Sequence, residues 1–224
     1  MGYGITVLVK GNRACFTRPE MHTERVSYDV ITPSAARGVL EAVYWKPAIR
    51  WVVDEIRVIN PVKFDSIRRN EVKHKAVESK LKSAMKNGSS LPYLNTEEDR
   101  AQRNTLYLKN VAYVVTAHFE LTDKAGESDT PEKHYNIALR RLRKGQHFNQ
   151  PYLGCREFPA EISLLEEGEE IPDSFYKDID SCDLGYMLYD LDFSNPNDPI
   201  PLFYRPVMKN GIIDVAKYAK EVAK

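Results

Sequence analysis

Cysteine is scarce in this sequence, and the few cysteines that occur lie far apart. Cys15, Cys155 and Cys182 form neither a metal-ligand spacing nor a disulfide framework, so a reducing cytoplasm is the expected location. We also expect no secretory leader, because the first residues already show a strand-like pattern, and no hydrophobic run in the sequence is long enough to span a membrane. We therefore expect no membrane partner.

Motifs of the common cofactor-dependent and covalent enzymes are absent as well. There is no glycine-rich phosphate loop, no nucleophile elbow, no zinc spacing and no carboxylate cluster shaped for two metal ions, and the five histidines are scattered. No cofactor is expected. An enzyme built from this chain would use metal-free acid–base chemistry, for which histidine is suited because its pKa lies near neutrality.

Charge is balanced overall but unevenly placed. Residues 1–150 carry 25 Lys and Arg against 17 Asp and Glu (25 − 17 = +8), whereas residues 151–224 carry 7 against 15 (7 − 15 = −8). A basic first part is typical of a polyanion-binding protein, and an ordinary solvated surface is the alternative. Charge alone leaves both interpretations open.

A helix with both ends marked is predicted between Thr32 and Lys46. Thr32 is a candidate N-cap, Pro33 suits the first helical turn, and Pro47 stops the helix at or just before Lys46. Apolar residues at helical spacing form a buried stripe: Ala36, Val39, Leu40 and Val43.

Arg37 and Tyr44 lie two turns apart at the edge of this stripe. A guanidinium and a phenol there would suit a phosphate. The plainer interpretation is a surface arginine and a tyrosine that flanks the core.

The first part of the chain follows the order strand, helix, strand, long strand, helix, strand. This is the split βαβ, ferredoxin-like pattern that RNA-recognition folds share, and it predicts an α+β fold. We expect a ferredoxin-like (RRM-like) domain at residues 1–166 and a small β-rich subdomain at 167–224. The predicted strands are 3–10, 49–59, 62–72, 106–121, 159–165, 184–193 and 202–208, and the later helices are 131–144 and 215–222.

The long strand gives the strongest alternation in the chain. Odd-numbered residues from Tyr113 to Leu121 form an apolar face, which predicts that this face lies on the core. His118 falls on the other, more polar face, beside Thr116 and Glu120. A histidine in this position is more often structural than catalytic.

Basic residues cluster at several places that could contact phosphate. Residues 73–104 read as a long basic loop, either a flexible linker or a nucleic-acid contact. Cations at the end of the second helix also suit the helix dipole. The candidate RNA-binding arginines are Arg18, Arg25, Arg37, Arg68, Arg69, Arg140 and Arg141.

Four segments stand out as near-continuous motifs: residues 18–20, 25–30, 32–47 and 150–158. They resemble the CRISPR-associated Cas5 family, subtype d (Dvulg, type I-C), and the resemblance covers essentially the whole chain. It implies a ferredoxin-like domain with an appended β subdomain. It also implies recognition of the CRISPR repeat hairpin, metal-independent cleavage of precursor CRISPR RNA at the base of the stem, and retention of the product in the type I-C surveillance complex with its other subunits.

The resemblance implies an active site of a tyrosine at the end of the first helix and a histidine on a central strand, which Tyr44 and His118 match. Some members carry a lysine beside the histidine, but Ala117 stands there in this chain. Lys46, Arg37 and Lys109 are candidates for the missing cation, and we place Lys46 in the expected catalytic set. A helix normally packs on one sheet face, so the two groups meet only if Tyr44 lies beyond the sheet edge or the strand bulges.

In the implied reaction the ribose hydroxyl attacks the adjacent phosphate and leaves a cyclic phosphate. Other Cas5 subtypes are mainly non-catalytic, so a structural subunit that binds the CRISPR RNA handle is the alternative. A basic surface would in addition permit non-specific binding of double-stranded DNA.

Overall fold

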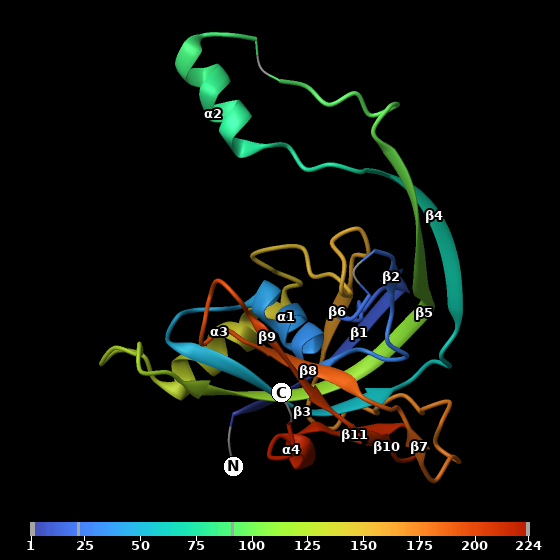
Figure 1. Ribbon diagram of the computed structural model, residues 1–224. Coiled ribbons are helices and arrows are strands. Elements are labelled where there is room, and N and C mark those ends of the chain that lie inside the picture. Colours follow the sequence, from blue (N-terminus) through green and yellow to red (C-terminus); the bar gives the residue numbers. More distant parts are fainter. Residues whose placement is uncertain (1–2, 22, 91, 223–224) are drawn as a thin grey trace.

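The computed structural model describes residues 3–21, 23–90 and 92–222, and its main layer is a mostly antiparallel sheet. The strand order is β11-β3-β5-β1-β6, and β2 and β4 also pair with β5 (Figure 1). The strands of this sheet are β1 Gly4–Ala14, β2 Arg25–Val26, β3 Ile49–Val58, β4 Phe64–Val72, β5 Arg100–Leu121, β6 Glu161–Leu165 and β11 Ile212–Asp214.

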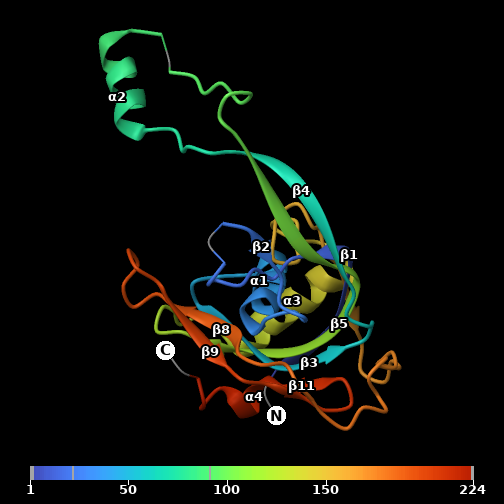
Figure 2. The same ribbon diagram turned by 45° about the vertical axis from the view of Figure 1, so that its right-hand side comes forward.

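Two helices, α1 Pro33–Val43 and α3 Pro131–Arg143, pack inside the curve of the sheet (Figures 1 and 2). The predicted helix starts are confirmed, since the side chains of Thr32 and Thr130 accept hydrogen bonds from the third residue after each. Helix α1 ends at Val43, earlier than predicted, because Tyr44 adopts an extended backbone (φ −150°, ψ 120°).

The alternation predicted for the long strand is confirmed in β5 between Val115 and Phe119, but Leu121, expected on the core face, is 40% exposed, and Ala112 and Val114 of the other face are buried. Tyr113, Val115, Ala117 and Phe119 are buried on the helix side, and His118 lies half-buried on the other side. Strand β3 pairs with this part of β5, with Trp51 opposite Phe119 and Val52 opposite His118. A β-bulge between Val53 and Glu55 gives β3 one extra residue, Asp54.

The C-terminal region shares its core with the first part of the chain. Its hairpin of β8 and β9 lies against α1, β11 extends the main sheet beside β3, and α4 packs on β3. Buried Met187, Tyr204 and Ile213 belong to the same hydrophobic cluster as the helices and β5. The elements here are β7 Cys182–Asp183, β8 Met187–Asp192, β9 Ile200–Tyr204, β10 Val207–Met208 and α4 Val215–Tyr218.

The chain between β4 and β5 forms an extension that leaves the body of the molecule (Figures 1 and 2). We call residues 72–100 the arm: it continues from the ribbon of β4 and the first part of β5, with α2 (Glu78–Asn87) at its tip. The prediction of a loop over 73–104 is wrong for α2 and for the start of β5. Helix α2 escapes detection because it buries only Ala84 and so carries no apolar stripe.

Two smaller predictions are also corrected. Strand β1 continues past Lys10 to Ala14, because it stays paired with β5 as far as Leu108. The strand expected at 202–208 is divided into β9 and β10.

No helix among the described residues has the length and apolar character needed to cross a membrane.

Candidate functional site

Tyr44 follows the last residue of α1, and its side chain is almost completely buried, at 2% exposed. Its hydroxyl lies 2.7 Å from Nδ1 of His134, a residue of α3 that is equally buried. Burial raises the pKa of the Tyr44 phenol, and the positive charge of Arg141 opposes that rise. The phenol is therefore protonated at neutral pH and can donate its proton to the imidazole.

Two charged residues flank this pair. The guanidinium of Arg141 lies 5.2 Å from the centre of the Tyr44 ring, and its Nη1 donates to the carbonyl oxygen of Val43 at 2.7 Å. Asp129 lies 3.2 Å from Nε2 of His134, but the angle is poor and Nε2 makes no hydrogen bond. Bonds from the Gly126 amide and then from Lys133 lower the pKa of Asp129, so this carboxylate is ionised.

His118 occupies the opposite face of the sheet and is partly accessible. Its Nδ1 lies 2.8 Å and 2.9 Å from the two carboxylate oxygens of Asp54, and both side chains are 32% exposed. The bulge in β3 places Asp54 where it can reach the ring. This contact fixes the imidazole through Nδ1, and Nε2 has no protein partner among the described residues.

The structure does not bring Tyr44 and His118 together. Phe119, which directly follows His118, packs against Trp51 and His134 on the helix side. Consecutive side chains of a strand point to opposite faces, so the sheet separates His118 from Tyr44. The bulge in β3 brings Asp54 to His118 but does not turn His118 toward the helices.

None of the three candidate cations lies beside His118. Lys109 pairs with Asp65 at 3.1 Å, and Arg37 makes a bidentate pair with Asp190 of β8. Burial of Arg37 favours the neutral form, but the hydrogen bonds that it donates to Asp190 and the negative charges of Asp190 and Glu41 together outweigh burial and raise the pKa of Arg37. The guanidinium of Arg37 is therefore bound to the Asp190 carboxylate, and it is not free to form a phosphate site with Tyr44. Lys46 lies on the helix side.

Another cation does share the face of His118. Arg50 lies opposite Glu120 in the register of β3 and β5, two residues along from the Val52–His118 pair. It forms an exposed ion pair with Glu120 at 3.0 Å, and its side chain is 66% exposed. Diagonal neighbours of this kind are about 7–8 Å apart, which is within the reach of an arginine side chain.

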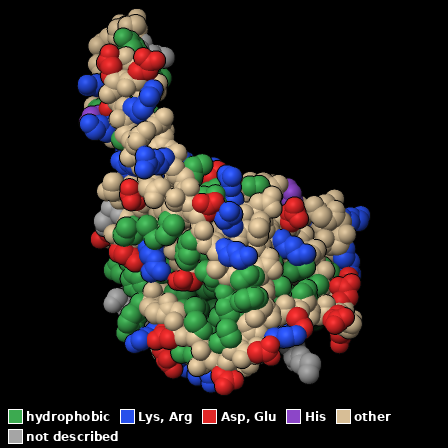
Figure 3. Space-filling view, turned by 90° about the vertical axis from the view of Figure 1, so that its right-hand side faces the viewer, with side chains coloured by type: hydrophobic (Ala, Val, Ile, Leu, Met, Phe, Trp, Pro, Cys, Tyr) green, Lys and Arg blue, Asp and Glu red, His purple; other side chains and the backbone are tan. Residues whose placement is uncertain are grey.

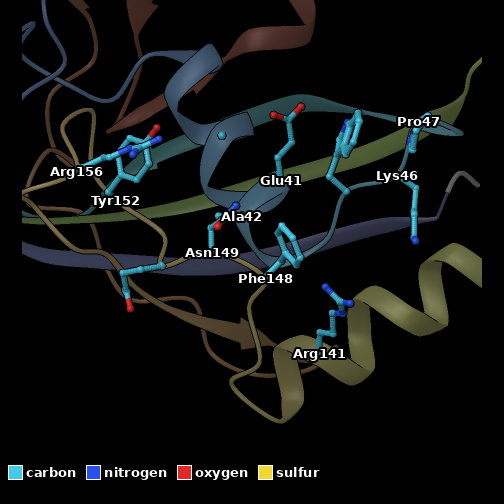
Figure 4. Close-up of a pocket in the computed structure, with 12 residues that line it drawn as sticks. Glu41, Ala42, Lys46, Pro47, Arg141, Phe148, Asn149, Tyr152 and Arg156 are labelled. Carbon is cyan, nitrogen blue, oxygen red and sulfur yellow. The ribbon is translucent and has the colours of Figure 1, made fainter. Parts of the chain in front are cut away.

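A cleft of about 850 Å³ opens between the end of α1, α3 and the segment 148–156 (Figure 4). Lys46 and Arg141 point toward one another across its mouth, from the end of α1 and from α3 (Figure 4). The amides of Phe148 and Asn149 donate to the carbonyl of Ala42 at 2.8 Å and 3.1 Å, and so fasten the segment to α1. The cleft is thus formed by secondary structure and a hydrogen-bonded loop.

Most of the arginines expected to bind RNA are engaged with carboxylates. Arg18 pairs with Asp29 and Glu20, while Arg25 and Arg69 share Glu157. By contrast, Arg68 and Arg140 are exposed and make no ion pair within the described ranges. Figure 3 shows Lys and Arg side chains gathered on the body of the molecule just below the arm.

Two thiols lie close together where the segment 148–156, the cleft loop, meets the end of β1: Cys155 belongs to this loop and Cys15 directly follows β1. The Cys155 thiol donates to the carbonyl of Cys15 at 3.6 Å, and Gly154 adopts a positive φ of 81° against that same carbonyl. Hydrogen bonding between the two thiols, more than the charge of nearby Arg25, lowers the pKa of Cys155 to about 7. Both cysteines are free thiols.

Sequence reasoning missed several functional candidates. Asp54 was hidden because a strand pattern does not reveal a bulge. His134 could have been found, since it precedes buried Ala138 and Leu142 by one and two steps of four residues. The aromatic lining of the cleft comes from Trp45, Phe148 and Tyr152, and no local pattern joins segments so far apart. In residues 3–21, 23–90 and 92–222, no three His, Cys, Asp or Glu side chains are grouped to hold a metal ion.

The chain is similar to known proteins over nearly its whole length. The family model for CRISPR-associated protein (Cas_Cas5), subtype Cas5d, matches residues 4–216. A protein of Mannheimia succiniciproducens named CRISPR pre-crRNA endoribonuclease Cas5d is 50% identical over 225 residues, with 99% of each chain covered. One of the same name from Thermus thermophilus is 42% identical over 203 residues, which cover 90% of this chain and 80% of that protein.

A solved structure gives the same result for the fold. A crystal structure described as a CRISPR-associated protein superposes with a TM-score of 0.67 at 28% identity, and the match covers 94% of this chain and 90% of that one.

Proposed function

The chain belongs to the CRISPR-associated Cas5 family, subtype d, and from this we propose that it is an endoribonuclease for precursor CRISPR RNA. In this proposal it recognises the repeat hairpin, cleaves without a metal ion, and remains on the product as a subunit of the type I-C surveillance complex in the cytoplasm. Relatives at 50% and 42% identity with the endoribonuclease name support the reaction.

The arrangement of the sheet supports a role in RNA binding. Strands β6, β1, β5 and β3 lie in that order with α1 and α3 on one side, which favours the ferredoxin-like (RRM-like) interpretation of the first part. Many RNA-binding modules are built on such a sheet. Any binding of double-stranded DNA would be a non-specific property of the basic surface.

The observation that carries the proposal is the accessible His118 imidazole held by Asp54. A catalytic acid or base needs an exposed nitrogen, a fixed orientation and a pKa near neutrality, and histidine held by a carboxylate meets the first two needs directly. RNA supplies its own nucleophile, the ribose 2′-hydroxyl. The protein therefore needs only to transfer protons and to stabilise the negative charge of the transition state.

The reaction follows from these parts. The 2′-hydroxyl attacks the adjacent phosphorus and the bond to the 5′-oxygen breaks, which gives a 2′,3′-cyclic phosphate and a free 5′-hydroxyl. His118 Nε2 exchanges a proton with the attacking or the leaving oxygen, and Arg50 on the same face neutralises the phosphorane. In this assignment Tyr44 is a positioning residue: it is buried, and it supports Arg141 and the cleft in which Lys46 binds the RNA backbone.

The test is cleavage of a repeat hairpin by the purified protein in excess chelator. We expect cleavage to persist, to stop when the attacking hydroxyl is replaced by hydrogen, and to fall by about 10²–10⁴ in His118→Ala while hairpin binding is retained. Loss of cleavage in chelator with rescue by Mg²⁺ would overturn metal independence.

A handle-binding subunit without activity is the second candidate. The observation that favours it is Ala117, which is fully buried where some relatives of this family are expected to carry a lysine. Tight hairpin binding by the wild-type protein with no cleavage under any condition would decide for this candidate and against the enzyme.

A further inference from the structure

Two of the three cysteines lie against each other where the cleft loop meets the end of β1. The Sγ atom of Cys155 lies 3.6 Å from the carbonyl oxygen of Cys15, and the Cys15 amide donates to the carbonyl of Leu153 at 3.0 Å. Gly154 packs on the same Cys15 carbonyl, and the two thiols hydrogen-bond to each other. A disulfide requires such an approach of two backbones, because its Cα atoms are only about 4.4–6.8 Å apart.

The surroundings of the two thiols differ. Cys15 is fully buried beside the carbonyl of Leu106, whereas Cys155 is partly exposed and its Sγ lies 4.0 Å from Nη1 of Arg25. The hydrogen bond from Cys15, and after it the charge of Arg25, lower the pKa of Cys155 to about 7 against burial and the charge of Glu157. The thiolate is the nucleophilic form of cysteine. A dissolved oxidant can therefore react with Cys155 but cannot reach Cys15 directly.

We propose that Cys155 and Cys15 form a redox couple, in which Cys155 reacts with a hydroperoxide and Cys15 then closes a disulfide. In the first step the Cys155 thiolate attacks one oxygen of hydrogen peroxide, the O–O bond breaks, and a sulfenic acid and a hydroxide ion form. In the second step the Cys15 sulfur attacks the sulfenic sulfur. The S–S bond forms, the S–O bond breaks, and the Cys15 proton leaves with the hydroxide as water. The two sulfurs together lose two electrons, which the peroxide gains.

The contact between the thiols also sets the order of the two steps. The pKa of Cys15 is raised first by its hydrogen bond to Cys155 and then by burial, so Cys15 stays protonated while Cys155 is a thiolate. Oxidation of Cys155 to the sulfenic acid removes that negative charge, whereas Arg25 and Arg69 still lower the pKa of Cys15. Cys15 thus becomes the better nucleophile only after Cys155 has reacted.

Simple packing accounts for only half of this arrangement. A buried cysteine commonly serves as a small apolar side chain, which suits Cys15 but not a partly exposed thiol beside an arginine. Redox-sensing cysteines have a low pKa, are accessible and lie next to a second thiol, and Cys155 meets all three conditions. In a reducing cytoplasm, which the proposed function implies, disulfides are usually transient and redox-sensing.

The disulfide would fasten a loop that hydrogen bonds now hold. Glu157, two residues after Cys155, binds Arg25 of β2 at 2.7 Å and also binds Arg69 of β4. A covalent bond from Cys155 to Cys15 would fix this loop to the end of β1, at the base of the β4–β5 ribbon. The couple is independent of the proposed cleavage reaction, since it involves neither His118 nor the cations on its face.

Mass spectrometry of the purified protein after treatment with hydrogen peroxide tests the couple. We expect a peptide pair linked between Cys15 and Cys155, with the loss of two hydrogen atoms, and recovery of both thiols in dithiothreitol. In Cys15→Ser the reaction should stop at the sulfenic acid of Cys155, which dimedone labels. In Cys155→Ser the Cys15 thiol should stay reduced, because it is buried.

Cys182→Ser is the matched control, since it removes the thiol in β7 and should form the disulfide as the wild type does. Absence of the Cys15–Cys155 bond in the oxidised wild-type protein would overturn the proposal, as would oxidation of Cys15 in Cys155→Ser. If a variant does not fold, the wild-type protein in glutathione buffers decides. A reversible Cys15–Cys155 bond supports the couple, and bonds that involve Cys182 instead contradict it.

Amide hydrogen exchange tests the effect of the bond on the loop. Exchange at residues 152–158 should be at least about tenfold slower in the oxidised than in the reduced protein, because a crosslink opposes local opening. Equal exchange in a protein whose disulfide has formed would show that the bond does not fix the loop.

Discussion

The Tyr44 hydroxyl and the Nδ1 atom of His134 lie 2.7 Å apart, and each side chain is 2% exposed. This hydrogen bond joins the end of α1 to α3 beneath the guanidinium of Arg141. Breaking it would leave a polar atom unpaired in the core, which is costly. Tyr44 therefore links α1 to α3 inside the core, whereas the His118 side chain is 32% exposed to solvent.

Tyr44→Phe should lower the free energy of unfolding by about 1–3 kcal/mol, because Nδ1 of His134 loses its partner in the core. Urea denaturation at pH 7 measures the change. Tyr93→Phe is the control, since that ring is 88% exposed and its loss of a hydroxyl should have no effect. Unchanged stability together with a hundredfold loss of cleavage would assign the Tyr44 phenol a chemical role instead.

Asp54→Asn should slow single-turnover cleavage by about tenfold or more, because the carboxylate holds the His118 ring in place through Nδ1. Glu55→Gln is the matched control: it neutralises the adjacent carboxylate, which pairs with Arg57 rather than with His118. Equal rates in wild type and Asp54→Asn would show that the orientation of His118 is set by other contacts.

The capped helices and the faces of β5 could be predicted from the sequence because local patterns determine them. Thr32 with Pro33 and Thr130 with Pro131 have the residue types preferred at a helix start, and alternation from Tyr113 to Leu121 assigns His118 to the open face. The carboxylates that pair with the arginines could not be predicted. Arg37 pairs with Asp190, which is 153 residues away in the sequence, and Arg25 pairs with Glu157, which is 132 residues away. Only the folded chain brings these residues together.

The candidate site also combines residues that the sequence indicates with contacts that only the tertiary structure determines. Tyr44 and His118 were selected by family resemblance, but their separation depends on which sheet face α1 covers. The bulge that brings Asp54 to His118 and the loop that brings Phe148 to the end of α1 are tertiary features without a local signature. Helix α2 was missed for the opposite reason, because a helix on an extended arm packs against almost nothing.

The free energy of unfolding should decrease as the pH rises above about 10. Burial raises the pKa of Tyr113, Tyr204 and Tyr44 above the ordinary value of about 10. The unfolded chain loses these protons first, so their contribution is complete below about pH 10 and is lost as the pH rises further. Unfolding free energies at pH 8 and pH 11 measure the effect. Tyr113→Phe should show a smaller drop, and an identical drop would contradict the assignment.

Cys155 should react with iodoacetamide near neutral pH, with a half-maximal rate at about pH 7. The reason is that its thiolate accepts a hydrogen bond from Cys15, whose own pKa is raised chiefly by that bond and then by burial. In Cys15→Ala the midpoint should move to higher pH, and Cys15→Ser should restore it in part. Alkylation of Cys155 that follows the same pH curve in all three proteins would rule out the coupling.

Gly154→Ala should destabilise the fold by more than about 1 kcal/mol, since only glycine takes its backbone conformation freely. A Cβ there would lie 2.0 Å from the carbonyl oxygen of Cys15, and φ is 81°. Gly126→Ala is the control, because its nearest neighbour would be 3.7 Å away. Thermal melts of both variants give the comparison, and equal melting temperatures would contradict the close approach of the cleft loop to β1.

The pairing of β11 with β3 has a consequence for the time at which the fold is completed during synthesis. Strand β3 ends at Val58 and β11 begins at Ile212, so a ribosome adds the 153 residues 59–211 between them. Through that interval the outer edge of β3 has no strand partner, and an open edge invites pairing with other chains. A chain that ends before β11 therefore leaves the edge of β3 open to pairing with other chains, and β11 closes that edge in the complete fold.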